Sequence, residues 1–367
     1  MHRILILLVL FVQCYFIFAQ ENASSDKSQY HFAITRPTVY NLQRLIFLVE
    51  NKLIQIPDLT VLAVYYDKED YDYNESLALL NLNNLLVNIE FYKLTGELNK
   101  DNIYTINDLT PQFEEIFNKT NGILFFGGDD LPPYTYSEKM ELTTVVEDTY
   151  RHFFELSFLY HLVGNYNQES DFSPLLEKKN DYLVWTFCLS TQTLNVTAGG
   201  SLIQDIPTEL YNMKYVEDVL EMPGNQVHKN YYKVLYPEKG YEGSKLHQIS
   251  IPDSSYLMQF TNENKSPFIN SYHHQCIDFL GKDLYPIAFS LDKKIIEAVK
   301  HKRFKNVLGL QFHPEKTELY DPSKKLLHSP KDSSQLSYFD ILNNNNSYQF
   351  HVNIWKEFSK TLLILNH

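Results

Sequence analysis

The sequence predicts a protein of the α/β class, with a mostly parallel sheet and helices on both faces, built as a single enlarged domain. Two observations support this prediction. Short apolar runs rich in strand-forming residues end abruptly on glycine or polar residues, and segments with helical spacing lie between them. Strands that alternate with helices favour a parallel sheet covered on both faces. Ligands of such sheets bind beyond the carboxyl ends of the strands, so we expect the functional residues there.

The predicted elements follow one another along most of the chain. The expected strands are HFAIT (31–35), VLAVYY (61–66), GILFF (122–126), YLVWTF (182–187), one strand and a turn within HQISIPDSSYLMQF (247–260), and NVLGLQF (306–312). The expected helices are PTVYNLQRLIFLVENKLI (37–54), the long stretch 137–164, the segment after Cys188, and YQFHVNIWKEFSKTLLILNH (348–367), which should pack back on the sheet. The domain is expected to span residues 30–367, with polar loop insertions near 165–181 and 321–347.

The first 20 residues have the composition of a secretory signal peptide. His2 and Arg3 precede a long apolar stretch that ends near Ala19 and Gln20 and runs into polar ENASSDKSQ. A membrane anchor is the competing interpretation, because an uncharged stretch of about 18 residues can span a bilayer. We expect cleavage, no stable membrane insertion afterwards, and a location outside the cell, in the periplasm, or in the lysosomal or vacuolar lumen.

Charge and cysteine content exclude some classes of partner. The chain has 32 Lys and Arg against 45 Asp and Glu, a formal net charge of −13, which repels nucleic acid and anionic membrane surfaces. Of the three cysteines, Cys14 lies in the predicted signal peptide. Two cysteines make no disulfide framework, so either Cys188 and Cys276 pair or at least one is a thiol kept for reactivity.

We expect a small-molecule substrate, and we leave a homodimer open.

Cys188 stands between the predicted strand YLVWTF and a predicted helix. A strand that turns sharply into a helix lifts the residue at the turn clear of the sheet, and the helix N-terminus favours a thiolate there. A buried structural cysteine is the alternative, since free cysteine is among the most buried residue types. Cys276 fits that alternative better and is predicted to be a small core residue.

Two further strand ends carry residues suited to thiol chemistry. His313, which follows NVLGLQF, could take the thiol proton, and Glu315 could fix the imidazole tautomer and stabilise its cation. Gly127 and Gly128, just after GILFF, would leave backbone amides free to bind a developing oxyanion. A tight structural turn is the alternative for the two glycines.

Taken together, several stretches resemble one family. They are GILFFGGDDLPPY, EDTYRHFFELSFL, the run from Cys188 through TQTLNVTAGGSLIQDIP, HQISIPDSSYL, INSYHHQCIDFLGKDLYPIAFSLDKKIIEAV and NVLGLQFHPE, spread over residues 120–316. In this order they resemble the class I glutamine amidotransferase-like hydrolases, specifically the γ-glutamyl hydrolase branch (peptidase family C26), which includes γ-glutamyl-γ-aminobutyrate hydrolases.

The resemblance implies a flavodoxin-like α/β fold and a thiol-dependent hydrolase. It implies a Cys-His-Glu triad of Cys188, His313 and Glu315, and an oxyanion hole at Gly128 and the amide of Leu189. The reaction implied is attack on a γ-glutamyl amide carbonyl, release of the amine, and hydrolysis of the thioester by water, without a metal or an organic cofactor. We expect these residues to contact the substrate: Gly127, Asp129, Gln192, Ser271, Tyr272, His273, His274 and Gln275. A structural role is the alternative for His273 and His274.

One departure from the family pattern bears on activity. The family has G-x-C-x-G at the elbow, whereas this chain has Thr186 and Ser190 in place of both glycines, and Leu189 in place of a basic or polar residue. A β-branched residue adds atoms where helix and strand press together. A non-catalytic binding protein that keeps the pocket is therefore an alternative function. A third is an amidotransferase subunit that feeds ammonia to a synthase, against which the predicted signal peptide argues.

Overall fold

A computed structural model describes residues 29–80, 85–165, 172–331 and 336–366. Its centre is a ten-stranded sheet in the order β3-β2-β1-β4-β5-β12-β11-β10-β7-β8. The first six strands of that order are mutually parallel. They are β1 (Phe32–Thr35), β2 (Thr60–Tyr66), β3 (Asn88–Leu94), β4 (Gly122–Phe125), β5 (Leu183–Phe187) and β12 (Val307–Leu310). The predicted signal peptide, residues 1–20, lies outside the described residues.

Four antiparallel strands extend the parallel sheet beyond β12. They are β11 (Ile296–His301), β10 (Leu284–Ser290), β7 (Lys245–Ser250) and β8 (Phe268–Ser271). A separate pair, β6 (Leu202–Ile203) and β9 (Cys276–Ile277), is also antiparallel. Only β7 of this extension was predicted from the sequence.

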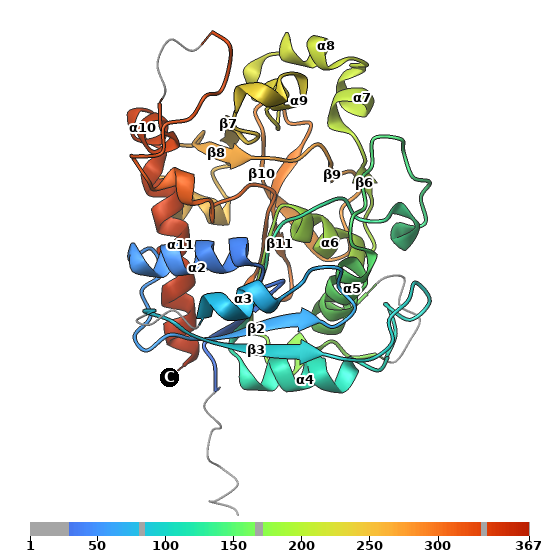
Figure 1. The fold of residues 1–367 in the computed structure, drawn as a ribbon. Helices are drawn as coiled ribbons and strands as arrows, with labels where there is room; N and C mark the ends of the chain where they lie inside the picture. The colour runs from blue at the N-terminus through green and yellow to red at the C-terminus, as the bar shows by residue number, and fades with distance from the viewer. Residues whose placement is uncertain (1–28, 81–84, 166–171, 332–335, 367) are drawn as a thin grey trace, which may run out of the picture.

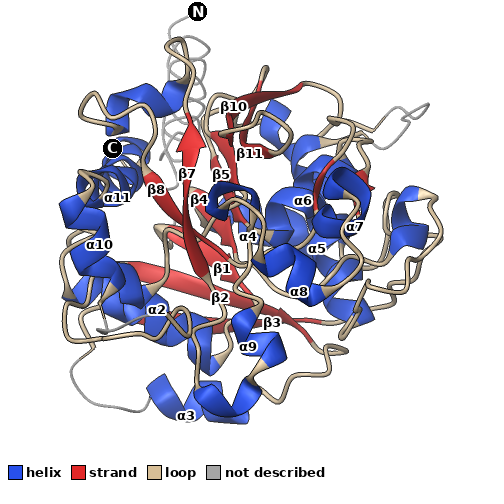
Figure 2. Ribbon diagram, turned by 90° about the horizontal axis from the view of Figure 1, so that it is seen from above, coloured by secondary structure: helices blue, strands red, loops and turns tan. Residues whose placement is uncertain are grey.

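Helices cover both faces of the sheet (Figures 1 and 2). The helices α2 (Val39–Glu50), α3 (Asn74–Leu80), α10 (Tyr338–Asn344) and α11 (Tyr348–Leu365) pack on one face. The helices α4 (Thr110–Lys119), α5 (Thr149–Val163) and α6 (Leu189–Thr197) pack on the other. This arrangement confirms the predicted flavodoxin-like α/β fold with a mostly parallel sheet in one domain.

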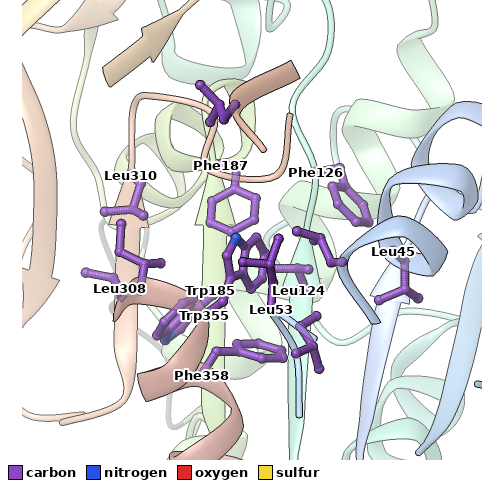
Figure 3. Packing of buried hydrophobic residues seen from close by; sticks show 14 of the residues in the cluster. Leu45, Leu53, Leu124, Phe126, Trp185, Phe187, Leu308, Leu310, Trp355 and Phe358 are labelled. Atoms are coloured by element: carbon purple, nitrogen blue, oxygen red, sulfur yellow. The ribbon is translucent and has the colours of Figure 1, made fainter. Parts of the chain in front are cut away.

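Alternate side chains of the central strand β5 enter the two cores. Leu183, Trp185 and Phe187 contribute to the core beneath α2 and α11, whereas Val184 contributes to the core beneath α5. Figure 3 shows Trp185 beside Phe358 of α11, with ring centroids 5.1 Å apart. The C-terminal helix therefore packs back on the sheet as predicted, and its apolar face closes the core.

Three short helices, α7 (Ile206–Tyr211), α8 (Val216–Leu220) and α9 (Tyr232–Leu235), gather at one end of the molecule, with α9 near β7 and α7 near β9 (Figure 1). None of the described helices is both long and apolar enough to cross a bilayer.

Several predicted boundaries were wrong. Helix α5 begins at Thr149 rather than at 137, because the Asp148 side chain accepts a hydrogen bond from the Arg151 amide and caps the helix. Helix α10 lies inside the predicted loop insertion 321–347. It starts with a capping box in which Ser337 and Asp340 satisfy each other's backbone amides. Strand β3 and helix α4 were not predicted.

Candidate active site

Cys188 occupies a sharp turn between β5, which ends at Phe187, and α6, which begins at Leu189. Its backbone is left-handed, with φ 52° and ψ −112°, although it is not glycine. A non-glycine residue in this region is strained, and such strain concentrates at functional sites. The Cys188 amide donates to the Leu310 carbonyl at 2.8 Å and ties the turn to β12. The chain thus forms the predicted elbow.

The elbow keeps this turn although Thr186 and Ser190 replace the two family glycines. The space around both side chains is sufficient, and both hydroxyls make hydrogen bonds. The Thr186 hydroxyl lies 3.0 Å from that of Thr191. Gly309 pairs with Thr186 across the sheet, and a Cβ there would lie 3.1 Å from the Thr186 hydroxyl and 2.7 Å from Thr191. The Ser190 hydroxyl donates to the Phe126 carbonyl at 2.5 Å. The extra side-chain atoms therefore fit because Gly309 leaves space opposite Thr186 and because both hydroxyls are hydrogen-bonded.

His313 and Glu315 form a buried pair after β12. Nδ1 of His313 lies 2.7 Å from Oε1 of Glu315, and Arg44 of α2 lies 3.2 Å from the same oxygen. Burial alone would raise the pKa of Glu315, but the charges of His313 and Arg44 outweigh it and hold that pKa at about 2. Since the carboxylate stays ionised and accepts at Nδ1, the proton of a neutral His313 is on Nδ1 and Nε2 is left as a base.

The glycines after β4 bring the two predicted catalytic side chains together. A Cβ on Gly127 would lie 3.0 Å from Cε1 of His313 and 3.1 Å from Cβ of Cys188. Cys188, His313, Gly127 and Gly128 line one cavity of about 690 Å³. The cavity opens at the carboxyl ends of three neighbouring parallel strands, β4, β5 and β12, as the sequence predicted.

The resting thiol is not activated in the way that the helix N-terminus predicted. Burial raises the pKa of Cys188 to about 12, and the charge of Glu315 adds to this, while the Leu189 amide opposes it. Nε2 of Gln311 lies 3.8 Å from the sulfur. No hydrogen bond joins the two described residues Cys188 and His313, and Nε2 of His313 is buried without a partner. Burial also lowers the pKa of His313, so the thiol and the imidazole are both neutral at neutral pH.

A buried ion pair supports the loop after β4 from behind. Nη2 of Arg151 lies 3.3 Å from Oε2 of Glu155, and it donates to the carbonyls of Phe126 and Gly127 at 2.9 and 3.1 Å. Both charged side chains of the pair are fully buried. These two hydrogen bonds from Arg151 hold the backbone of the loop in one orientation beside the cavity.

The family resemblance implies an oxyanion donor at Gly128, and a displaced donor loses most of its effect, so we expect Gly128→Ala to lower kcat by about 10²-fold. A Cβ on Gly128 would lie 1.9 Å from Nη1 of the fully buried Arg151, so the loop must move. Steady-state kinetics with a γ-glutamyl substrate measures the loss. Gly224→Ala is the matched control, since a Cβ there meets nothing closer than 3.9 Å. Wild-type kcat in Gly128→Ala would contradict the assignment of this loop.

Some residues predicted to contact substrate lie on the cavity wall and others do not. Gly127, Asp129 and Tyr272 line the cavity. Five others are absent from its lining, in contrast to the prediction: Gln192, Ser271, His273, His274 and Gln275.

The reason is that the side chains of these five bond elsewhere. Gln192 donates to the Gln275 carbonyl at 3.0 Å, and the Ser271 hydroxyl donates to the His228 carbonyl at 2.8 Å. His274 lies between Asp130 and Asp205, at 3.0 Å from each, and these carboxylates raise its pKa to about 9 although burial acts to lower it. Neighbouring side chains in this loop point in different directions, and their spacing in the sequence does not reveal which of them face the cavity.

Arg44 and Arg151 were not predicted from the sequence. Both are cations on the buried side of a helix whose neighbours are apolar, and Arg151 precedes Glu155 by four residues. A charged residue in an apolar helical stripe, with an opposite charge at i+4, is the signal that could have identified the second.

The two remaining cysteines are free and buried, so the alternative of a disulfide is wrong. Cys276 packs with Ile206 and Ile295 and is a core residue, as predicted.

A parallel α/β sheet with a cysteine elbow and a histidine–glutamate pair at the adjacent strand end defines the class I glutamine amidotransferase-like proteins. The family model described as Peptidase C26 matches residues 103–315. This chain therefore belongs to the peptidase C26 family, and its function is of the hydrolase or amidotransferase-like kind.

The chain is also similar to individual proteins and solved structures. A putative glutamine amidotransferase-like protein of Rickettsia prowazekii (strain Madrid E) is 29% identical over 244 residues, covering 58% of this chain and 85% of the relative. One of Lactococcus lactis subsp. lactis is 29% identical over 219 residues, covering 58% and 75%. A crystal structure of a glutamine amidotransferase from Thermotoga maritima has a TM-score of 0.34 and 13% identity, covering 85% of this chain and 95% of that one.

Proposed function

We propose that this protein is a thiol-dependent hydrolase that cleaves a γ-glutamyl amide or peptide bond through Cys188, His313 and Glu315. The observation that supports the proposal most is the cavity shared by the Cys188 elbow, the His313–Glu315 pair and the Gly128 loop. A nucleophile, a base held in one tautomer, and free amides at one strand edge are the parts that acyl transfer requires.

The charges around the cavity favour a substrate that carries both signs. Arg36, Lys233 and Lys316 line it together with Asp129, Glu242 and Glu318. A γ-glutamyl group presents an α-carboxylate and an α-ammonium on the same carbon, so cations and acids on one wall can hold it in one orientation. An uncharged amide would leave these groups unused.

The proposed reaction assigns one task to each residue. His313 takes the proton of the Cys188 thiol at Nε2 while the sulfur attacks the γ-carbonyl carbon. The amides of Gly128 and Leu189 donate to the oxyanion. His313 then returns its proton to the leaving amine, and the C–N bond breaks. Water, deprotonated by His313, hydrolyses the thioester and frees the thiol, while Glu315 stabilises each imidazolium that forms.

Mass spectrometry after incubation with paired γ-glutamyl and α-glutamyl dipeptides of the same amine tests this function. We expect release of glutamate and amine from the γ-linked member, and a transient mass increase on the peptide that contains Cys188. No turnover of any γ-glutamyl amide, or equal turnover of both linkages, would contradict the proposal.

A non-catalytic binding protein is the second candidate function. The pKa of Cys188, raised to about 12 by burial, and the missing thiol–imidazole hydrogen bond favour it. Calorimetric binding of γ-glutamyl peptides that stay intact over a day, with equal affinity in Cys188→Ala, would establish this function instead.

We expect the acidic limb of kcat/KM to lie below pH 6.5. His313 acts as a base only when neutral, and burial lowers its pKa below the ordinary value of 6.5, although Glu315 opposes this. Activity should therefore persist in mildly acidic medium, which suits the lysosomal or vacuolar lumen among the proposed locations. The pH dependence of kcat/KM measures the midpoint. A midpoint clearly above 6.5 would show that His313 is not the group that titrates.

A further inference from the structure

A second cluster of polar side chains lies outside the lining of the cavity. It consists of His228, which precedes α9, His247 on β7, His273 after β8, and Glu297 on β11. All four residues are at least 95% buried. One ligand atom from each can be chosen so that the four atoms lie within 4.8 Å of one another. Four segments far apart in the sequence therefore bring three imidazoles and one carboxylate to one point.

Two of the imidazoles are held in a known tautomer. Nδ1 of His247 lies 3.1 Å from the Gln248 carbonyl, and Nδ1 of His273 lies 2.8 Å from the Gln275 carbonyl. A carbonyl only accepts, so each Nδ1 carries a proton and donates it. In a neutral ring the lone pair is then on Nε2, and these atoms lie 3.8 and 3.9 Å from the carboxylate of Glu297. Backbone carbonyls orient metal-binding histidines in this way.

The inward-facing atoms of the cluster lack partners. Nδ1 of His228 lies 3.2 Å from Oε1 of Glu297. Six side-chain atoms of the cluster make no hydrogen bond with any residue that the structure describes. They are both ring nitrogens of His228, Nε2 of His247, Nε2 of His273 and both carboxylate oxygens of Glu297. Lone pairs thus face a buried carboxylate, an arrangement that repels unless a cation lies between them.

We propose that His228, His247, His273 and Glu297 bind one Zn²⁺ ion as a closed structural site. Three imidazoles and one carboxylate suit zinc, and four protein ligands without an open position are typical of structural rather than catalytic zinc. Tetrahedral ligands at zinc distances lie about 3.3 Å apart. The separations in the cluster start at 3.2 Å and stay within 4.8 Å, so small side-chain shifts suffice.

The position of the proposed ion indicates a structural role. The short helices α7 to α9 bury few side chains of their own, namely Ile206, Pro207 and Val219. The ion would connect the loop before α9 to β7 and β11. The backbone carbonyl of Glu297 accepts from the backbone N–H of Gln311 at 2.8 Å, and the side-chain Nε2 of Gln311 lies 3.8 Å from the Cys188 sulfur. Tyr272, beside His273, lines the cavity. The zinc site would therefore fix one wall of the active site without taking part in the chemistry.

Metal analysis of the full chain purified from zinc-supplemented medium tests the proposal. Inductively coupled plasma mass spectrometry should find about one zinc per chain, and the variants His247→Gln and Glu297→Gln should lose it. The matched control is His301→Gln, since His301 is a buried histidine on the same strand as Glu297. Cys188→Ala should also keep one zinc, which separates this site from adventitious binding at the active-site thiol. Chelation should lower the melting temperature by about 5–10 °C.

X-ray absorption spectroscopy of the wild-type chain decides the matter if the variants do not fold. The expected zinc shell holds nitrogen and oxygen at about 2.0–2.2 Å, with imidazole scattering and no sulfur. Wild-type protein that takes up no zinc after incubation, a sulfur ligand, or full zinc content in both His247→Gln and Glu297→Gln would overturn the proposal. None of these measurements depends on activity, so they stand apart from the test of hydrolysis.

Discussion

Cys188→Ala is expected to lower kcat/KM for a γ-glutamyl amide by at least about 10⁴-fold. The variant keeps the oxyanion amides and the cavity but has no atom that can form the thioester, so only the effects of binding and of the oxyanion hole remain. Its fold should persist, because alanine is smaller than cysteine and the turn is held by the backbone bond from residue 188 to the Leu310 carbonyl. The residual rate is measured at an enzyme concentration high enough for the product of this slow reaction to exceed the detection limit.

Cys276→Ala is the matched control for this substitution. Cys276 is the second buried thiol among the described residues, and it packs with Ile206 and Ile295, outside the lining of the cavity. We expect its kcat/KM to stay within about threefold of wild type, with a small loss of stability from the missing sulfur. Equal hydrolysis by Cys188→Ala and wild type would place the nucleophile elsewhere.

The same thiol has a pH dependence that distinguishes the resting enzyme from a preformed thiolate–imidazolium pair. Because burial raises the pKa of Cys188 to about 12, alkylation by iodoacetamide should accelerate steadily from pH 7 to pH 10. A plateau near neutral pH would show a stable thiolate, whose charge would have to be stabilised by His313.

The sequence predicted the parts of the site that depend on strand ends. In a parallel sheet the carboxyl ends share one edge, so an apolar run followed by Cys188, His313 or Gly128 already brings those residues into proximity. It could not predict Arg44, which meets Glu315 across 271 positions and depends on how α2 docks. Nor could it predict which members of NSYHHQ face the cavity, because side-chain direction in a loop follows from tertiary contacts.

Most of the antiparallel part of the sheet also could not be predicted from the sequence. Strands β10 and β11 carry mixed apolar and polar residues, and β10 contains a proline and shifts register against β11. Such strands gain their stability from cross-strand pairs rather than from a continuous apolar run, so neither run length nor alternation marked them. The candidate zinc ligands His247 and Glu297 lie on this half of the sheet, which is why no spacing pattern in the sequence indicated the cluster.

Glu315→Gln is expected to lower kcat by about 10³–10⁴-fold with little change in KM. The carboxylate accepts from Nδ1 of His313 and so keeps Nε2 free as a base, whereas an amide can donate to Nδ1 and turn the ring to the wrong tautomer. It also removes the charge that stabilises imidazolium in the transition state. In addition, Arg44 would be left as a buried cation without its carboxylate partner, which should cost about 3 kcal/mol of stability.

Kinetics at a temperature well below the melting point separates the two effects, because the loss of kcat persists where the variant is fully folded. Asp321→Asn serves as the control, since this half-buried carboxylate accepts hydrogen bonds from Ser323 and interacts with Lys324, both on its own loop. Retention of kcat within about threefold in Glu315→Gln would mean that the tautomer of His313 is set by another group or that His313 is not the base. The size of the loss therefore measures how far proton transfer depends on one buried oxygen.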